Sequence, residues 1–268
     1  MVLRPVVTVL LLLLTACAPA AGGPTASQST ASQSAPSPSP VHWSYEGEEG
    51  PEHWGELSPD YELCANGTQQ SPIDIANPTA ADLANVAFDY QPAPLEIVNN
   101  GHTIQVTYAP GSSIQLEATS YELLQFHFHA PSEHLVNGAA VDAELHLVHR
   151  SAAGALAAVG VLMAETVGSA ENPALASVWS NLPEAPGPAR QVDAQIDAET
   201  LLPENRLTFR YQGSLTSPPC SEGVSWLMMT EPIGISAGQL EALHAIMEGN
   251  NRPIQPLNER PLVEDTTP

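Results

Sequence analysis

The stretch LLQFHFHAPSEH, residues 123–134, alternates apolar and polar side chains in the manner of an extended strand. Side chains two positions apart point to the same face of a strand. Gln125, His127 and His129 therefore share one face, while the two phenylalanines between them share the other. A single strand histidine is usually a hydrogen-bonded core residue, so two on one face leave a structural and a metal-binding interpretation open.

A second segment, AELHLVHR (residues 143–150), supplies a third histidine. Alternation puts Glu144, His146 and Val148 on one face of it. The linking residues contain an Asn-Gly turn signal at 137–138, so the two strands can pair as an antiparallel hairpin. Three neutral imidazoles without a thiolate favour zinc, with a fourth coordination position left open for water.

Two of these histidines have a polar residue two positions earlier in the chain, on the same face of the strand. Gln125 precedes His127, and Glu144 precedes His146. An acceptor at this position can hold an imidazole N–H and fix the tautomer that leaves the other nitrogen free for a metal.

The sequence pattern after residue 42 predicts short strands separated by turns. The β-rich runs are 95–100, 103–109, 113–118, 121–130, 141–150, 155–165, 206–212 and 223–231. Two helices are predicted, one beginning near Asn172-Pro173 and one over 236–247. No internal repeat and no second linker is present. We predict one mainly β (α+β) domain with helices at its periphery.

The charge of the chain is strongly acidic. Its 268 residues include 30 Asp and Glu against seven Arg and no Lys, which gives a formal net charge of −23. Such a surface repels nucleic acid and anionic lipid headgroups, so we expect neither as a partner.

The N-terminus has the pattern of an export signal. An apolar run follows Arg4 and ends in LTAC, which resembles the lipobox of bacterial lipoproteins, so residues 1–16 are predicted to be a signal peptide and Cys17 a lipidated residue. The alternative is an ordinary signal peptide cleaved near residues 18–21. Residues 17–41 are rich in Ala, Ser and Pro and are predicted to form a disordered tether. The prediction is an exported protein that faces the periplasm or exterior and touches a membrane only through its anchor.

The cysteine count is consistent with export. If Cys17 carries lipid, Cys64 and Cys220 remain, and an even pair in an exported protein favours one disulfide. The alternative is two buried thiols.

Several longer motifs resemble those of the α-class carbonic anhydrases. These are QFHFHAPSEH, AELHLVH, GSLTSPPCSEGVSW and NNGH, with HWSYEG, GPEHWGEL, QQSPIDI and NNRPIQPLNER around them. The resemblance runs in order from His42 to Leu262. It implies a large, mostly antiparallel twisted central sheet with peripheral helices, and zinc at the base of a conical cleft. It also implies a catalytic domain over 42–262. We further predict an acidic tail over 263–268, and a monomer or homodimer.

The resemblance further implies reversible hydration of CO2 to bicarbonate by attack of zinc-bound hydroxide, with one Zn2+ per chain. The implied ligands are His127, His129 and His146, and the backbone of Asn250 is the implied acceptor for His129. Two more residues orient the hydroxide in this family. Thr216 matches the threonine that accepts a hydrogen bond from it, and Glu133 matches the glutamate to which that threonine donates.

Other positions match the substrate pocket and the proton path of the family. The pocket residues implied are Val148, Ala158, Leu215, Ser217 and Trp226. His102 matches the proton-shuttle histidine, whose pKa near neutrality suits transfer through water. The residues implied to order that water are Tyr45, Asn100 and Gln105.

Two other functions are compatible with parts of the sequence. A catalytically silent relative used as a binding module would typically lack a zinc histidine, and this chain keeps all three. An unrelated zinc-bearing β-sheet lipoprotein would not match over so many segments. The remaining histidines are interpreted as structural, with His134 anchoring its loop and the others playing no part in the site: His42, His53, His149 and His244.

Overall fold

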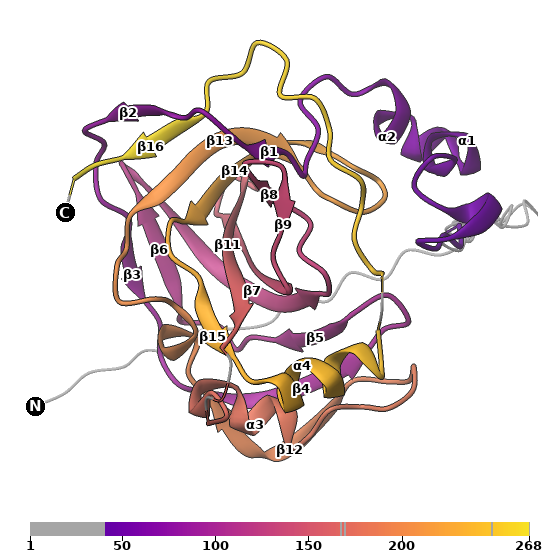
Figure 1. The fold of residues 1–268 in the computed structure, drawn as a ribbon, viewed down its shortest axis with the longest axis vertical. Helices are drawn as coiled ribbons and strands as arrows, with labels where there is room; N and C mark the ends of the chain where they lie inside the picture. The colour runs from indigo at the N-terminus through magenta and orange to yellow at the C-terminus, as the bar shows by residue number, and fades with distance from the viewer. Residues whose placement is uncertain (1–40, 167, 169, 248, 268) are drawn as a thin grey trace, which may run out of the picture. The chain divides into compact units, whose positions relative to one another are not determined.

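The computed structural model describes residues 41–166, 168, 170–247 and 249–267 (Figure 1). The predicted signal peptide, Cys17 and nearly all of the predicted tether lie outside the described residues. Within the described part of the chain, no helix has both the length and the apolar character needed to cross a membrane.

Strands dominate the described chain, and the helices are short. The α-helices are α1 (Trp54–Leu57), α2 (Leu63–Asn66), α3 (Ala176–Trp179) and α4 (Ala237–His244), and the 3-10 helices are Gly47–Glu49, Pro59–Tyr61, Pro173–Leu175 and Ala198–Leu201. The strands are β1 (Asp74–Ile75), β2 (Thr79–Ala81), β3 (Ala87–Asp89), β4 (Ala93–Asn99), β5 (Ile104–Thr107), β6 (Ser113–Leu116), β7 (Thr119–His129), β8 (Leu135–Val136), β9 (Ala139–Ala140), β10 (Ala143–Ser151), β11 (Leu156–Glu165), β12 (Arg190–Ile196), β13 (Thr208–Ser214), β14 (Glu222–Met229), β15 (Ile233–Ile235) and β16 (Val263–Asp265).

Most of the described strands join one large sheet. Its main path runs β12-β4-β5-β7-β10-β11-β14-β13-β16-β2, and β3, β6 and β15 pair beside it. The pairs are mostly antiparallel, with parallel pairs such as β11–β14. The predicted mainly β fold with a mostly antiparallel central sheet and peripheral helices is therefore confirmed.

The hairpin between β7 and β10 forms at the predicted turn. Asn137 and Gly138 both have positive φ, at 51° and 81°, and they join the small strands β8 and β9. In the antiparallel β7–β10 register, His127 lies opposite His146 and His129 lies opposite Glu144. The predicted convergence of the three histidines therefore follows from strand pairing.

The phenylalanine face of β7 is the face of the main apolar core. Phe126 and Phe128 are fully buried there, beside Leu145 and Leu147 of β10. Burying one such side chain contributes roughly 1.5–3 kcal/mol. A one-residue slip of register would move these side chains to the histidine face, so burial fixes the orientation of the histidines.

The structure adds elements that the sequence patterns did not predict. Strand β12 was missed, although Val192, Ala194 and Ile196 alternate with polar residues along it and face the main core, with only Ile196 fully buried. Strand β16 (Val263–Asp265) lies at the start of the segment predicted to be an acidic tail, and it pairs with β13 and β2. Helix α4 follows Ser236, the first residue of the predicted helix, whose side chain caps it by accepting from the Gln239 N–H, and ends at His244, before the predicted end at 247.

Candidate active site

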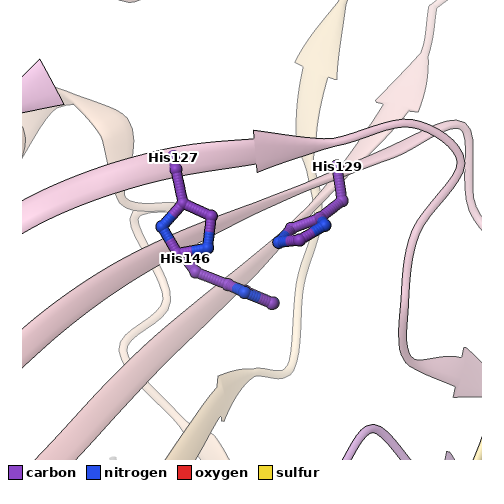
Figure 2. A group of neighbouring side chains, drawn as sticks. All are labelled: His127, His129 and His146. Atoms are coloured by element: carbon purple, nitrogen blue, oxygen red, sulfur yellow. The ribbon is translucent and has the colours of Figure 1, made fainter. Parts of the chain in front are cut away.

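The three histidines of β7 and β10 converge on one point (Figure 2). Their ring centroids are 5.0 Å apart for His127 and His129, 5.2 Å for His127 and His146, and 4.6 Å for His129 and His146. One nitrogen from each ring lies within 4.8 Å of the others. Both His129 and His146 are almost fully buried. The arrangement is compact enough for three imidazoles to share one ion.

Each imidazole uses its other nitrogen to donate to an acceptor. His127 Nδ1 lies 2.9 Å from Gln125 Oε1, His129 Nδ1 lies 2.7 Å from the Asn250 carbonyl oxygen, and His146 Nε2 lies 2.7 Å from Glu144 Oε1. These bonds leave Nε2 of His127, Nε2 of His129 and Nδ1 of His146 without protons. Fixing the tautomer in this way is what partners of metal-binding histidines do.

The free nitrogens are suited to a metal. His129 Nε2 is buried and has no hydrogen-bond partner. Burial lowers the pKa of all three histidines, that of His129 to about 4, so the rings are neutral at pH 7. Neutral imidazole is the form that binds metal. Three such nitrogens without a thiolate fit Zn2+ with an open fourth position.

A second close group, formed by His134, Glu144 and His146, is already satisfied by hydrogen bonds. Glu144 Oε1 accepts from both His134 Nδ1 and His146 Nε2, each at 2.7 Å. Glu144 Oε2 accepts from the backbone N–H groups of Glu133 and His134, each at 2.8 Å. Burial would raise the pKa of Glu144, but His134 and His146 hold it well below its usual range. Glu144 is therefore an ionised acceptor, and its oxygens are engaged by N–H donors.

Glu133 is buried beside the free nitrogens. Its Oε2 lies 3.5 Å from His129 Nε2 and 3.8 Å from His146 Nδ1, while its Oε1 accepts from the Arg252 backbone N–H at 2.9 Å. Burial raises the pKa of Glu133 to about 7, against the opposing influence of His146, the Arg252 N–H and the Thr216 hydroxyl. The Thr216 hydroxyl therefore lies close enough to act on the Glu133 carboxyl. Glu133 Oε2 itself has no hydrogen-bond partner. A nearby dication would favour the ionised carboxylate.

A disulfide closes the loop that carries Thr216. Cys64 and Cys220 are bonded, with their Cα atoms 5.1 Å apart, as predicted. The Cys220 N–H donates to the Ser217 carbonyl oxygen at 2.9 Å, and the Leu215 N–H donates to the Ser221 carbonyl oxygen at 3.0 Å. The bridge thus joins this short loop to helix α2, 156 residues away in sequence.

Comparison with known proteins identifies this arrangement. The chain matches the family model of the eukaryotic-type carbonic anhydrases over residues 49–266. A carbonic anhydrase of Nostoc sp. is 45% identical over 230 residues, which cover 84% of this chain and 86% of the relative. The chain belongs to the α-class carbonic anhydrases. Its reaction is that of a carbonate dehydratase, which interconverts CO2 and bicarbonate.

Solved structures of carbonic anhydrases share the fold. The α-carbonic anhydrase of Thermovibrio ammonificans, in complex with the inhibitor sulfanilamide, is 47% identical with a TM-score of 0.79, covering 83% of this chain and 99% of that one. A hyperthermostable carbonic anhydrase from an active hydrothermal vent chimney is 44% identical with a TM-score of 0.80, covering 84% of this chain and 100% of that one.

An apolar row lies beside the histidines of this carbonic anhydrase. Val148 of β10 pairs with Ala158 of β11, which in turn pairs with Trp226 of β14. Leu215 packs against the same cluster. Val224, which the sequence analysis did not name, is also buried in it, two residues before Trp226. Strand alternation from Trp226 could have identified Val224.

The residues predicted to handle protons lie around a half-buried histidine. The His102 ring stacks on Trp43, with ring centroids 3.7 Å apart and planes 7° apart. Burial and the neighbouring His42 lower the pKa of His102. Asn100 Oδ1 accepts from the backbone N–H groups of His102 and Thr103, which fixes this turn. The sequence analysis missed Trp43, although HWSYEG places it between His42 and the predicted Tyr45.

The other predicted water-ordering residues lie on nearby segments. Gln105 of β5 pairs with His127 in the β5–β7 register. Tyr45 packs edge-on against Trp43 and Trp54, and burial followed by the charge of Glu133 raises its pKa well above 10. Tyr45 is therefore a protonated phenol at neutral pH.

Proposed function

We propose that this carbonic anhydrase hydrates CO2 with Zn2+ held by His127, His129 and His146. The observation that carries the proposal is the set of three unprotonated nitrogens, each on a ring whose other nitrogen donates to a fixed acceptor. Bound there, zinc would lower the pKa of water to about 7 and so supply hydroxide at neutral pH, the magnitude being the one known for carbonic anhydrase itself. Neutral ligands preserve the charge of the dication for this effect.

Thr216 and Glu133 are proposed to aim the hydroxide. Glu133 Oε1 is held by the Arg252 N–H, which leaves Oε2 to accept from the Thr216 hydroxyl. An ionised carboxylate only accepts, so Thr216 must donate to Glu133 and accept from the hydroxide. This direction orients a lone pair of the nucleophile toward the substrate carbon.

The apolar row is proposed to hold CO2 beside the nucleophile. CO2 is small and carries no net dipole, so a wall made of Ala158, Leu215 and Trp226, with Val148 paired to Ala158, accepts it without leaving a polar group unsatisfied. Ala158 is nearly fully buried and has a small side chain, so it limits the depth of the pocket less than a larger aliphatic residue would. Ser217, next to Thr216, is proposed to contact the bound species.

His102 is proposed to carry the product proton to bulk buffer. Its ring lies at a half-buried position, between solvent and the interior. Because the pKa of His102 is lowered, its ring stays neutral at pH values below the usual pKa of histidine, and it can still accept a proton there. Tyr45, Asn100 and Gln105 are proposed to order the water through which the proton travels.

Stopped-flow measurement of CO2 hydration tests the proposed function. Purified protein is measured as prepared, after zinc removal with a chelator, and after zinc is restored. Turnover should disappear with the metal and return with it. Unchanged turnover after complete zinc removal would contradict the zinc-based proposal.

We further propose that the protein acts outside the cytoplasm as a lipid-anchored monomer or homodimer. The Cys64–Cys220 disulfide supports export, because such bonds persist in oxidising compartments. The LTAC sequence before the long Ala/Ser/Pro-rich segment supports lipidation of Cys17 and a tethered catalytic domain. Labelled fatty acid should enter the full chain and be lost in Cys17→Ala. A released protein whose N-terminus lies at residues 18–21 would instead indicate ordinary signal cleavage.

A further inference from the structure

A chain of buried hydrogen bonds extends from Glu144 away from the zinc ligands. His134 Nδ1 lies 2.7 Å from Glu144 Oε1, and His134 Nε2 lies 2.7 Å from the Tyr211 hydroxyl. The Tyr211 hydroxyl lies 2.8 Å from Ser71 Oγ, which in turn accepts from the Ser214 N–H at 3.1 Å. All of these groups are buried.

The direction of these bonds is fixed from the Glu144 end. The ionised Glu144 carboxylate only accepts, so His134 Nδ1 donates to it and the neutral ring leaves Nε2 as an acceptor. The Tyr211 hydroxyl therefore donates its proton to His134 Nε2. Tyr211 then accepts from the Ser71 hydroxyl, and Ser71 Oγ accepts from the Ser214 N–H.

We infer that Tyr211 is a positioning residue for zinc, because its hydroxyl satisfies His134 Nε2 and so holds the ring whose Nδ1–H orients the Glu144 carboxylate. Glu144 then accepts from His146 Nε2, and His146 Nδ1 stays free for the metal. The inference rests on the proposed zinc site and adds a residue that touches none of its ligands.

The Tyr211 ring is held so that its hydroxyl has one orientation. It stacks on Trp226 with planes 9° apart, and the Arg260 guanidinium lies 5.6 Å from its centroid. A Cβ at Gly213 would lie 2.8 Å from a Tyr211 ring carbon, so the backbone there is also closely packed. Packing of the ring therefore holds the Tyr211 hydroxyl within hydrogen-bond distance of His134 Nε2.

Loss of this hydroxyl removes the donor that satisfies His134 Nε2 in the tautomer bound to Glu144. With phenylalanine at 211, His134 Nε2 would be buried without a donor. A proton that moved to Nε2 would leave two acceptors, Nδ1 and Glu144 Oε1, facing one another at 2.7 Å. In either state the Glu144 carboxylate is less well fixed, and its hydrogen bond from His146 Nε2 is weakened.

The opposite face of the sheet offers a matched control. There the Tyr90 hydroxyl lies 2.8 Å from His149 Nε2, the pair is also buried, and His149 lies on the same strand as His146. Tyr90→Phe thus removes a tyrosine–histidine hydrogen bond of the same length without touching Glu144.

The test is the zinc dissociation constant of the full chain, measured by competition with a chelator, for wild type, Tyr211→Phe and Tyr90→Phe. Replacing partners that hold zinc ligands directly weakens zinc by about 10–100-fold, so Tyr211→Phe, one residue further out, should weaken it about tenfold. Tyr90→Phe should stay within about twofold of wild type. If Tyr211→Phe does not fold, His134→Gln, which removes the Nδ1–H donor to Glu144, is measured instead with the same expected loss.

The possible results separate this inference from the proposed function. Tight binding by wild type with equal affinity in both tyrosine variants would overturn the role of Tyr211. Equal weakening in both variants would also overturn it, because it would indicate a general effect of losing a buried hydroxyl. Failure of wild type itself to bind one zinc per chain would instead overturn the proposed function.

Discussion

Strand β10 carries two buried histidines three residues apart, and their surroundings differ. His146 faces Glu144, His127 and His129, with one nitrogen bonded to a carboxylate and the other free. His149 faces the apolar core, where its Nε2 bonds to the Tyr90 hydroxyl and its Nδ1 has no hydrogen-bond partner and no second histidine beside it in the described metal-ligand groups. Burial lowers the pKa of both, and that of His149 to about 3. Neither burial nor one free nitrogen therefore distinguishes a ligand; the convergence of three such nitrogens on one point does.

The largest expected difference between the two histidines is in metal binding. His146→Ala should lose zinc and reduce CO2 hydration by more than about a hundredfold, the upper range for residues that only support ligands. His149→Gln should keep one zinc per chain and activity within about threefold. Metal analysis together with stopped-flow hydration measures both. A His146→Ala variant that kept both its zinc and its activity would contradict the assignment of His146 as a ligand.

The next effect concerns two buried threonines on strand β13 and the loop that follows it. Thr216→Ala should lower kcat/KM by roughly 10²–10³-fold, as expected for the loss of one preorganised hydrogen-bonding group. Thr216→Ser should restore much of the activity because it restores the hydroxyl. Thr208, whose hydroxyl accepts from Arg210 Nε at 2.9 Å, provides the control, and Thr208→Ala should leave kcat/KM within about threefold. Equal losses in both alanine variants would contradict a specific role for Thr216.

A smaller effect is expected at His102. His102→Ala should lower kcat roughly tenfold or more in weak buffer, and added imidazole should restore it, because the lost step is proton transfer. Since the pKa of His102 is lowered, the wild-type shuttle step should persist to pH values below 6.5, where an ordinary histidine would be protonated. His53→Ala, at an exposed position, is the control. An unchanged kcat in weak buffer would refute the shuttle role.

The smallest effect concerns stability and belongs to His149. The unfolded chain binds a proton at this residue below about pH 6.5, whereas the folded chain does so only near pH 3. The unfolded state therefore holds more protons in this range, and the free energy of unfolding falls as pH falls from 6.5 toward 3. This residue contributes about 1.4 kcal/mol per pH unit to that slope.

Urea unfolding of wild type and His149→Gln between pH 6.5 and 4 measures the contribution. The variant should show the shallower dependence, by about one proton. Parallel curves for the two proteins would mean that His149 is not buried as a neutral ring.

Local alternation was sufficient to predict strands β7 and β10 and the face that each histidine occupies. It was sufficient because phenylalanines and leucines on one face leave only one way to bury the core. The resemblance then named Asn250 and Thr216, which no local pattern connects to the histidines. Strand β12 was missed because its apolar face is short and weak: Val192 and Ala194 are only half-buried, and Ile196 alone is buried. Tyr211 and Arg252 were also missed, because their contacts join segments more than 70 residues apart.

The central claim is that this face holds one zinc ion by three imidazoles, with Glu133 and Glu144 acting as acceptors. X-ray absorption at the zinc edge of the metal-loaded protein tests it most directly. The account predicts scattering from three imidazole nitrogens at about 2.0–2.1 Å and one oxygen from water. Two imidazoles with a protein carboxylate, as the group of His134, Glu144 and His146 would require, would contradict it.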